Sequence, residues 1–412
     1  MSMLDGTLSE LARLRSCSEP IVSLYLDVRW SDERQRDRVR LYVQDRIRKT
    51  LGHYPDDAPG HEALSRTLGR VQEFVNGLTT QANEAEKNGL ALFACESLSL
   101  WRTHFFHRTF QPELCTDGIP HLTQFARLAD DDEPAIVIMP SRQGADVFQV
   151  LLGDLARQEQ LRGPLPRSDG DGWNTGTGEP GGPAEREKRD QRGEEERVHR
   201  TWRLAAEQAT QLLDGTLGAH LVLIGPSATL AAFERELPDR LRARVIARVP
   251  RPRQWASNAG VQRDGIIAGA ADAVTHHEAQ AEAKAVAEVV GQSLRGGLAV
   301  LGPEDVVQAL NQGRVHRLVL EEDFARTGWR CDNCDALGAN AESAEVCPYC
   351  AGALRAVQYL GEALVARTLG EGGAVELVRH THKLHSYRGV GAFLRQSAGN
   401  GLKGAKPDFR SP

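Results

Sequence analysis

Residues 299–320 read AVLGPEDVVQALNQGRVHRLVL, and this stretch decides the fold class. The apolar run at its start predicts a strand over 298–301, and the segment 303–311 predicts a helix. Residues 315–320 are again largely apolar and predict a second strand. The alternation continues outside the stretch, with a helix predicted over 278–294, another over 362–369 and a strand over 374–378. The last third of the chain is therefore expected to be an α/β (α+β) domain, with helices packed on a small sheet.

The rest of the chain divides into two further regions. A length of 412 residues predicts two to three domains, at about 150 residues each. The acidic run Asp130-Asp131-Asp132-Glu133, which ends in a proline, marks one boundary. The second boundary is placed near Ala270, after a Pro-Arg-Pro-Arg segment. The predicted domains are residues 1–133, 134–270 and 271–412.

Apolar runs and periodic patterns predict the elements of the first two domains. The first domain is expected to hold a strand over 20–28, helices over 34–49 and 61–78, and a hairpin of strands over 90–94 and 98–105. The second is expected to hold strands over 135–139, 145–152 and 220–225, and helices over 194–213 and 228–236. The polar stretch 163–193 includes the glycine-rich segment DGDGWNTGTGEPGG at 169–182. Because it has almost nothing to bury, it predicts a flexible loop.

Four of the seven cysteines fall within twenty residues, as Cys331-Asp-Asn-Cys334 and Cys347-Pro-Tyr-Cys350. Two CxxC knuckles at this spacing can place four thiolates tetrahedrally around one Zn²⁺ ion. Four cysteine ligands leave no open coordination position, so the predicted zinc is structural and residues 329–352 form a zinc minidomain. A redox motif would explain only one CxxC pair. Four unrelated buried cysteines are the remaining alternative.

The net charge of −6 argues mildly against nucleic-acid binding by the whole molecule. Locally, however, residues 240–253 hold six arginines and no acid, and residues 379–410 hold seven basic residues against one acid. Such stretches suit the phosphate backbone of RNA. The alternative is a solvated helix face, which we favour for the third basic stretch, 34–49. The candidate RNA contacts are Arg240, Arg242, Arg244, Arg248, Arg251, Arg253, Arg379, Lys383, Arg388 and Arg395.

Neither a membrane span nor a secretion signal is expected. The sequence has no run of about 18 apolar residues, and its first residues, MSMLDGTLSELARLRS, lack a basic stretch followed by an apolar one. A cytoplasmic location is therefore expected.

The stretch 299–315 resembles the C-terminal domain of the archaeo-eukaryotic release factor and Pelota family, where a strand leads into a G-x-E-D-x-x-x-A-L-x-x-G-x-V unit. Residues 387–395, YRGVGAFLR, resemble the family's closing glycine-rich segment. The cysteine block occupies the place where family members insert a minidomain that sometimes binds zinc. Weaker similarity at 22–26, 88–93 and 202–207 extends the resemblance to most of the chain. The resemblance implies a three-domain release-factor/Pelota-like architecture, with a zinc-ribbon insertion in a C-terminal domain like those of kink-turn RNA-binding proteins.

In release factors of this family a GGQ loop enters the peptidyl-transferase centre, and its glutamine helps to orient the hydrolytic water. The glycine-rich loop has the corresponding place here, and its candidate residues are Trp173, Gly181, Gly182 and Pro183. The residue after the two glycines is a proline, which has neither a side-chain amide nor a backbone N–H to hold a water. Gln191 could substitute only if the alignment shifts, and a mere linker is the alternative for the loop. The stop-codon signature NIKS is absent from the first domain.

The two absences make the chain most similar to the Balon-type ribosome hibernation factors among bacterial members of the family. The resemblance implies a non-enzymatic, cytoplasmic stress-response protein that binds rRNA in the A site of idle 70S ribosomes and blocks the decoding and peptidyl-transferase centres. It also implies elongation factor Tu as a partner, no membrane association and a monomer off the ribosome. Two alternatives stay open: a ribosome-rescue peptidyl-tRNA hydrolase or release factor, and a protein that binds structured RNA off the ribosome.

Overall fold

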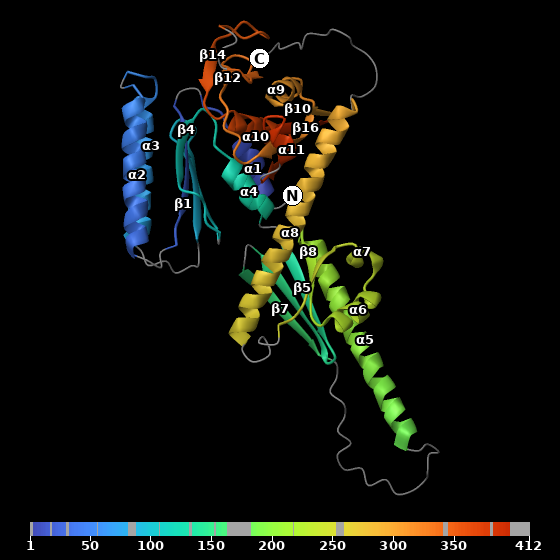
Figure 1. Cartoon of the computed structure of the whole chain (residues 1–412). Helices are drawn as coiled ribbons and strands as arrows, with labels where there is room; N and C mark the ends of the chain where they lie inside the picture. The colour runs from blue at the N-terminus through green and yellow to red at the C-terminus, as the bar shows by residue number, and fades with distance from the viewer. Residues whose placement is uncertain are drawn as a thin grey trace. The chain divides into compact units, whose positions relative to one another are not determined.

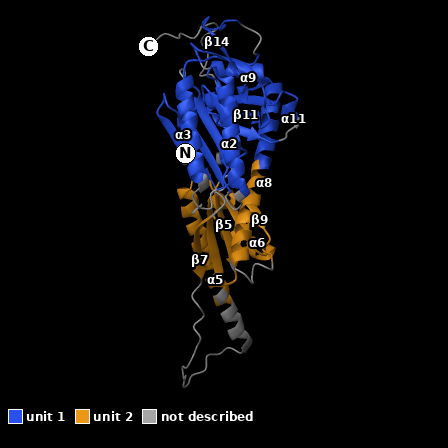
Figure 2. Cartoon of the chain, turned by 90° about the vertical axis from the view of Figure 1, so that its left-hand side faces the viewer, with its two compact units in different colours: residues 1–130, 279–412 blue, residues 131–278 orange. Residues whose placement is uncertain are grey.

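The computed structural model describes residues 3–16, 19–29, 33–55, 57–80, 88–106, 108–131, 134–151, 154–162, 183–216, 218–252, 259–340, 345–379 and 382–395. The chain divides into two compact units, the first made of Met1–Asp130 with Ala279–Pro412 and the second of Asp131–Glu278 (Figure 2). The predicted mixed α/β fold class is confirmed, because both units combine helices with sheets. Among the described residues, no helix has the length and apolar character that a membrane span requires.

The N-terminal part of the first unit is an antiparallel sheet of order β3-β2-β1-β4, with helices on both faces (Figure 1). Strands β1 and β2 are fully buried, because α2 and α3 cover one face while α1 and α4 pack on the other. The predicted strands and helices of this region are confirmed; α1, β4 and α4 were not predicted. The elements are α1 (Met3–Ala12), β1 (Ile21–Asp27), α2 (Glu33–His53), α3 (His61–Thr80), β2 (Gly89–Cys95), β3 (Leu100–Phe106), β4 (Glu113–Asp117) and α4 (Thr123–Asp131).

The C-terminal part of the first unit is a second sheet, of order β10-β16-β11-β15. The strand–helix–strand predicted around residues 299–320 is confirmed as β10, α9 and β11. Strand β16 lies between β10 and β11 and is antiparallel to both, a pairing that the sequence did not indicate. Gly302 and Gly313 flank α9 with φ of 87° and 65°, which glycine adopts without strain. The elements are β10 (Ala299–Leu301), α9 (Pro303–Asn311), β11 (Val315–Glu321), α10 (Leu360–Gly370), β15 (Ala374–Val378), α11 (His382–His385) and β16 (Val390–Leu394).

The second unit is built on a five-stranded sheet of order β7-β6-β5-β8-β9. Helices α5 and α6 cover one face, where Trp202 and Phe233 are buried. The first half of α8 covers the other face through Ile266 and Ala270. The elements are β5 (Ala135–Ser141), β6 (Gly144–Leu151), β7 (Asp154–Arg162), α5 (Pro183–Gly215), β8 (His220–Ile224), α6 (Ser227–Glu236), α7 (Asp239–Arg242), β9 (Val245–Val249) and α8 (Ala259–Leu294).

One prediction for this unit is wrong, and the strand β7 was not predicted. The prediction of a loop over 163–193 is wrong for its last part, because α5 begins at Pro183 and residues 183–193 are helical, while residues 163–182 lie outside the described residues. That segment has no apolar stripe to reveal a helix, but it is rich in Glu, Lys and Arg, which are good helix formers, and proline is favoured in a first turn. Strand β7 was missed because its sequence, DLARQEQLR, is mostly polar. As an edge strand it needs no fully buried face.

The helix predicted over 278–294 begins much earlier, at Ala259, so that α8 contributes residues to both units. The domain boundary placed near Ala270 therefore falls inside a continuous helix. Each predicted domain contains one of the three larger sheets. The division into three domains stays a prediction.

Candidate metal centre and basic surface

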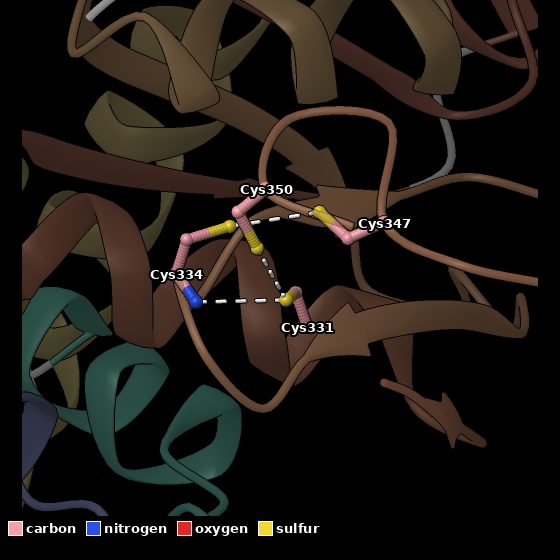
Figure 3. Close-up of side chains that lie close together, drawn as sticks. All are labelled: Cys331, Cys334, Cys347 and Cys350. Atoms are coloured by element: carbon pink, nitrogen blue, oxygen red, sulfur yellow. Dashed lines mark hydrogen bonds between the residues drawn. The ribbon is translucent and has the colours of Figure 1, made fainter. Parts of the chain in front are cut away.

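The four predicted zinc ligands lie together in a small sheet inserted between β11 and α10. The sheet has the order β13-β12-β14, with β12 (Gly328–Cys331), β13 (Leu337–Gly338) and β14 (Leu354–Val357). Cys331 ends β12 and Cys334 lies in the turn that follows, while Cys347 and Cys350 form a second turn before β14. The four side chains point toward one another (Figure 3). We call this sheet with its two turns the ribbon.

The two knuckles of the ribbon share one backbone geometry. In each, the N–H of the residue after the second cysteine donates to the carbonyl of the first cysteine. The distances are 3.1 Å from Asp335 to Cys331 and 2.8 Å from Ala351 to Cys347. Asp335 and Ala351 also share a left-handed backbone, with φ of 60° and 58°. The repeated CxxC spacing thus produces two turns that present their thiols alike.

The sulfur atoms are spaced for a tetrahedral ion. The Sγ atoms of Cys331 and Cys350 lie 3.4 Å apart, and those of Cys334 and Cys347 lie 3.6 Å apart. A tetrahedron with Zn–S bonds of about 2.3 Å has edges of about 3.8 Å, so a central ion requires only a small outward movement of the thiolates. All four ligand atoms lie within 4.8 Å of one another. The donor set therefore fits Zn²⁺ in a closed, structural site.

The thiols of the ribbon differ in how readily they ionise. A hydrogen bond with Asn333 is the main cause that lowers the pKa of Cys350 to about 6. Burial raises the pKa of Cys334 to about 12, and it also raises the pKa of Cys331. The group thus cannot hold four negative charges unaided. A metal ion that binds all four thiolates must displace the remaining protons.

The ribbon is attached to the rest of the first unit through the side chain of Asp335. Its carboxylate pairs with Arg330 in the ribbon, with Arg367 of α10 at 3.0 Å and with Arg15 after α1 at 3.7 Å. The Asn311 side chain adds two hydrogen bonds to the backbone of Leu337, at 2.8 and 2.9 Å. Except for Arg330, these partners lie outside the ribbon, and no local pattern could have indicated them.

The predicted loop residues Trp173, Gly181 and Gly182 lie outside the described residues. Pro183 is the first residue of α5. Farther along this helix, Nε1 of Trp202 donates to the carbonyl oxygen of Ser141 at 3.1 Å, which fixes α5 to the sheet of the second unit.

Most of the arginines of the 240–253 stretch bind groups of the protein itself. Arg248 donates to both carboxylate oxygens of Glu234, and this hydrogen bonding raises the pKa of Arg248. Arg251 is exposed and has no ion pair or hydrogen bond within the described ranges, and Arg253 lies outside them. The other partners are Asp214 for Arg240 at 3.9 Å, Asp239 for Arg242 at 3.2 Å, and the carbonyl oxygen of Ala219 for Arg244 at 2.6 Å.

The C-terminal candidates show the same behaviour. Arg388 makes two hydrogen bonds to the carboxylate of Glu304, at 2.7 and 2.5 Å. Lys383 is exposed on α11. Arg379 pairs with the carboxylate of Glu322 at 3.5 Å. Arg395 donates to the carbonyl oxygen of Glu371 at 3.0 Å. The ion pairs of Arg379 and Arg388 offset part of the positive charge that a count along the chain indicates, and contact with RNA stays a prediction.

Comparison with known proteins gives the chain a resemblance over part of its length. Residues 120–264 match the family model described as "Bacterial archaeo-eukaryotic release factor family 10", and the match spans most of the second unit. It confirms the resemblance to the bacterial archaeo-eukaryotic release factors that the sequence motifs indicate. No curated protein matches the chain.

Several solved structures also match the chain. One is the archaeal translation termination factor aRF1, with 17% identity, coverage of 95% of this chain and 97% of that chain, and a TM-score of 0.25. Another is Pelota of Archaeoglobus fulgidus, with 14% identity, coverage of 76% and 80%, and a TM-score of 0.32. A third is Dom34 of S. cerevisiae, described as a translation termination-like factor, with 10% identity, coverage of 74% and 80%, and a TM-score of 0.38.

Proposed function

We propose that this chain is a translation factor that acts on the ribosome. The observation that carries the proposal is the match of residues 120–264 to a bacterial release-factor family. The family motifs over 299–315 and 387–395 support it from the other end of the chain. Because the resemblance implies work in the A site, the partner is the 70S ribosome and the contacts are largely with rRNA.

Within this class we propose a factor that occupies idle ribosomes without hydrolysing peptidyl-tRNA, as Balon-type hibernation factors do. The support is chemical: Pro183 follows the two glycines and begins α5, and proline lacks the groups that could orient a water. Helix α5 has 33 residues, so it spans about 50 Å. We propose that a helix of this length lets the segment before Pro183 reach the peptidyl-transferase centre and block it sterically.

The other parts of the proposal rest on resemblance alone. They are delivery by elongation factor Tu, a role under stress and a cytoplasmic setting. For the rRNA contacts, Arg251 and Lys383 are the best placed candidates, since both are exposed and neither has an ion pair among the described residues.

Co-sedimentation with vacant 70S ribosomes tests ribosome binding. We expect the full chain to pellet with the ribosome and to be displaced by a tRNA bound in the A site. A variant in which residues 169–182 are permuted at constant composition should lose binding or protection of the peptidyl-transferase centre, because the loop would no longer fit. A chain that stays entirely ribosome-free, even from starved cells, would remove the proposal and favour RNA binding elsewhere.

Release of labelled peptide from stalled ribosome complexes tests the non-hydrolytic role. We expect no release above buffer by the unmodified chain. Pro183→Gln, which creates the sequence Gly-Gly-Gln at residues 181–183, should raise release if these residues occupy the GGQ position. Release by the unmodified chain that disappears in Gln191→Ala, but persists in the control Gln211→Ala on the same helix, would establish the hydrolase instead.

A further inference from the structure

A second group of metal-ligating side chains lies at the edge of the N-terminal sheet. Glu113 and Cys115 lie two residues apart on the edge strand β4, so their side chains are on the same face of the strand. His121 lies between β4 and α4, and the ligand atoms of these three residues lie within 4.8 Å of one another. Asp117, two residues beyond Cys115, brings its Oδ2 to 3.5 Å from Nε2 of His121.

The His121 ring is deeply buried, and the Asp117 carboxylate, 3.5 Å from Nε2, contacts it at more than an ordinary hydrogen-bond distance. The residue is 1% exposed, and neither ring nitrogen has a hydrogen-bond partner. Its backbone is fixed on both sides, because its N–H donates to Oγ of Ser23 at 3.0 Å and its carbonyl accepts from the Tyr25 hydroxyl at 2.7 Å. Its ring packs edge-on against Tyr359, with centroids 4.9 Å apart. A buried polar group held in this way calls for a partner.

The other two side chains are held in place as well. Cys115 is 7% exposed, and its thiol donates to Oε1 of Glu113 at 3.1 Å. The amide of Gln124 donates to the second oxygen of Glu113 at 2.5 Å. Burial raises the pKa of the Cys115 thiol.

We propose that Glu113, Cys115 and His121 bind a Zn²⁺ ion. Sulfur, imidazole nitrogen and carboxylate oxygen are the donors that this ion combines, whereas Ca²⁺ and Mg²⁺ prefer oxygen alone. A tetrahedral site with these donors has S···O and N···O edges of about 3.6 and 3.4 Å. The thiol of Cys115 lies 3.1 Å from Oε1 of Glu113, shorter than that S···O edge, so these two donors would move apart around an ion. The ligand atoms of all three residues lie within 4.8 Å of one another. Binding releases the Cys115 proton to solvent and gives a His121 nitrogen a partner.

The site lies where the N-terminal sheet meets the C-terminal part of the first unit. The two residues after His121, Leu122 and Thr123, donate their backbone N–H groups to Oε2 of Glu362 in α10, at 2.6 and 3.1 Å. An ion that clamps His121 to β4 would therefore hold the start of α4 against α10. This structural role does not depend on the proposed ribosomal function.

The zinc content of the full chain, after dialysis against a weak chelator, tests the proposal. We expect about two equivalents per chain, one in the ribbon and one at β4. Cys115→Ser and His121→Ala should each retain about one equivalent, as should Cys347→Ser, and the double variant Cys115→Ser/Cys347→Ser about none. Cys95→Ser is the matched control and should keep both, because Cys95 is a buried cysteine of the same sheet that donates instead to Glu19.

Cobalt substitution covers the case in which a variant fails to fold. In the Cys347→Ser protein, Co²⁺ at β4 should give the visible bands of a tetrahedral site with a single thiolate. These bands should disappear on adding Glu113→Gln, which replaces a partly exposed ligand and can be checked for folding by circular dichroism. About one equivalent of zinc in the unmodified chain, lost entirely in Cys347→Ser with no cobalt bands remaining, would overturn the proposal.

Discussion

The ribbon and the arginine-rich stretch 240–253 both stand out by composition, but their side chains find their partners in different places. In the ribbon, the four cysteines find one another across 3.4 and 3.6 Å, and each needs only the other three. In the stretch, Arg240, Arg242 and Arg248 are paired with carboxylates of the same unit. A motif whose residues contact one another can be recognised from its sequence alone. The charge that a basic stretch exposes depends on which carboxylates the rest of the chain places beside it.

The largest effect should come from breaking the ribbon. Cys347→Ser should lose the zinc of the ribbon and lower the free energy of unfolding by several kcal/mol, because structural zinc contributes about 10–16 kcal/mol of apparent binding free energy in zinc-finger peptides. Zinc analysis and thermal unfolding measure both quantities. Cys95→Ser serves as the control for loss of a buried thiol. A variant with full zinc content and unchanged melting would contradict the four-cysteine site.

A smaller loss is expected where the ribbon depends on residues outside it. Asp335→Asn keeps a residue that tolerates the left-handed backbone but removes the charge that Arg15, Arg330 and Arg367 share. We expect a loss of about 1–2 kcal/mol in urea unfolding, since these side chains are partly buried. The control is Asp332→Asn, whose partner Arg355 is about half exposed, and it should change stability by less than about 0.5 kcal/mol. Equal effects of the two would show that burial does not matter here.

Within the basic stretch, the free arginine should matter more for binding than a paired one. Arg251→Gln should weaken ribosome binding about threefold to tenfold, or ~0.7–1.4 kcal/mol. It should also reduce the slope of log affinity against log salt by about 0.7–0.9. Arg244→Gln removes a side chain engaged with the Ala219 carbonyl, so it should leave that slope unchanged. Fluorescence titration at several salt concentrations would show whether the two differ.

The smallest effect should come from releasing a paired arginine. Glu234→Gln frees Arg248 and should raise affinity for rRNA about twofold to threefold, with a salt slope steeper by about 0.7. The cost in stability should be below about 1 kcal/mol, because the pair is partly exposed. Glu236→Gln, which instead releases Arg203 on α5, is the control. No gain in affinity from Glu234→Gln would place Arg248 away from the bound RNA.

Prediction from the sequence succeeded where the signal was a continuous apolar run or a closely spaced motif. The strand–helix–strand around residues 299–320 and the buried strand β1 are of this kind, because their apolar residues follow the spacing of the element that buries them. It failed for β7 and for the first turns of α5, which are polar and show no periodic stripe. It also failed for β16, whose place between β10 and β11 is decided by pairing rather than by composition.

The sequence by itself determined the alternation of helices and strands, the two knuckles and the resemblance to release factors, since each depends on neighbouring residues. Only the tertiary structure placed the ring of His121 against Tyr359, and only it brought Arg15 and Arg367 to Asp335. The reason is physical: a contact between residues far apart in the sequence depends on how sheets and helices pack. A local pattern carries no information about that packing.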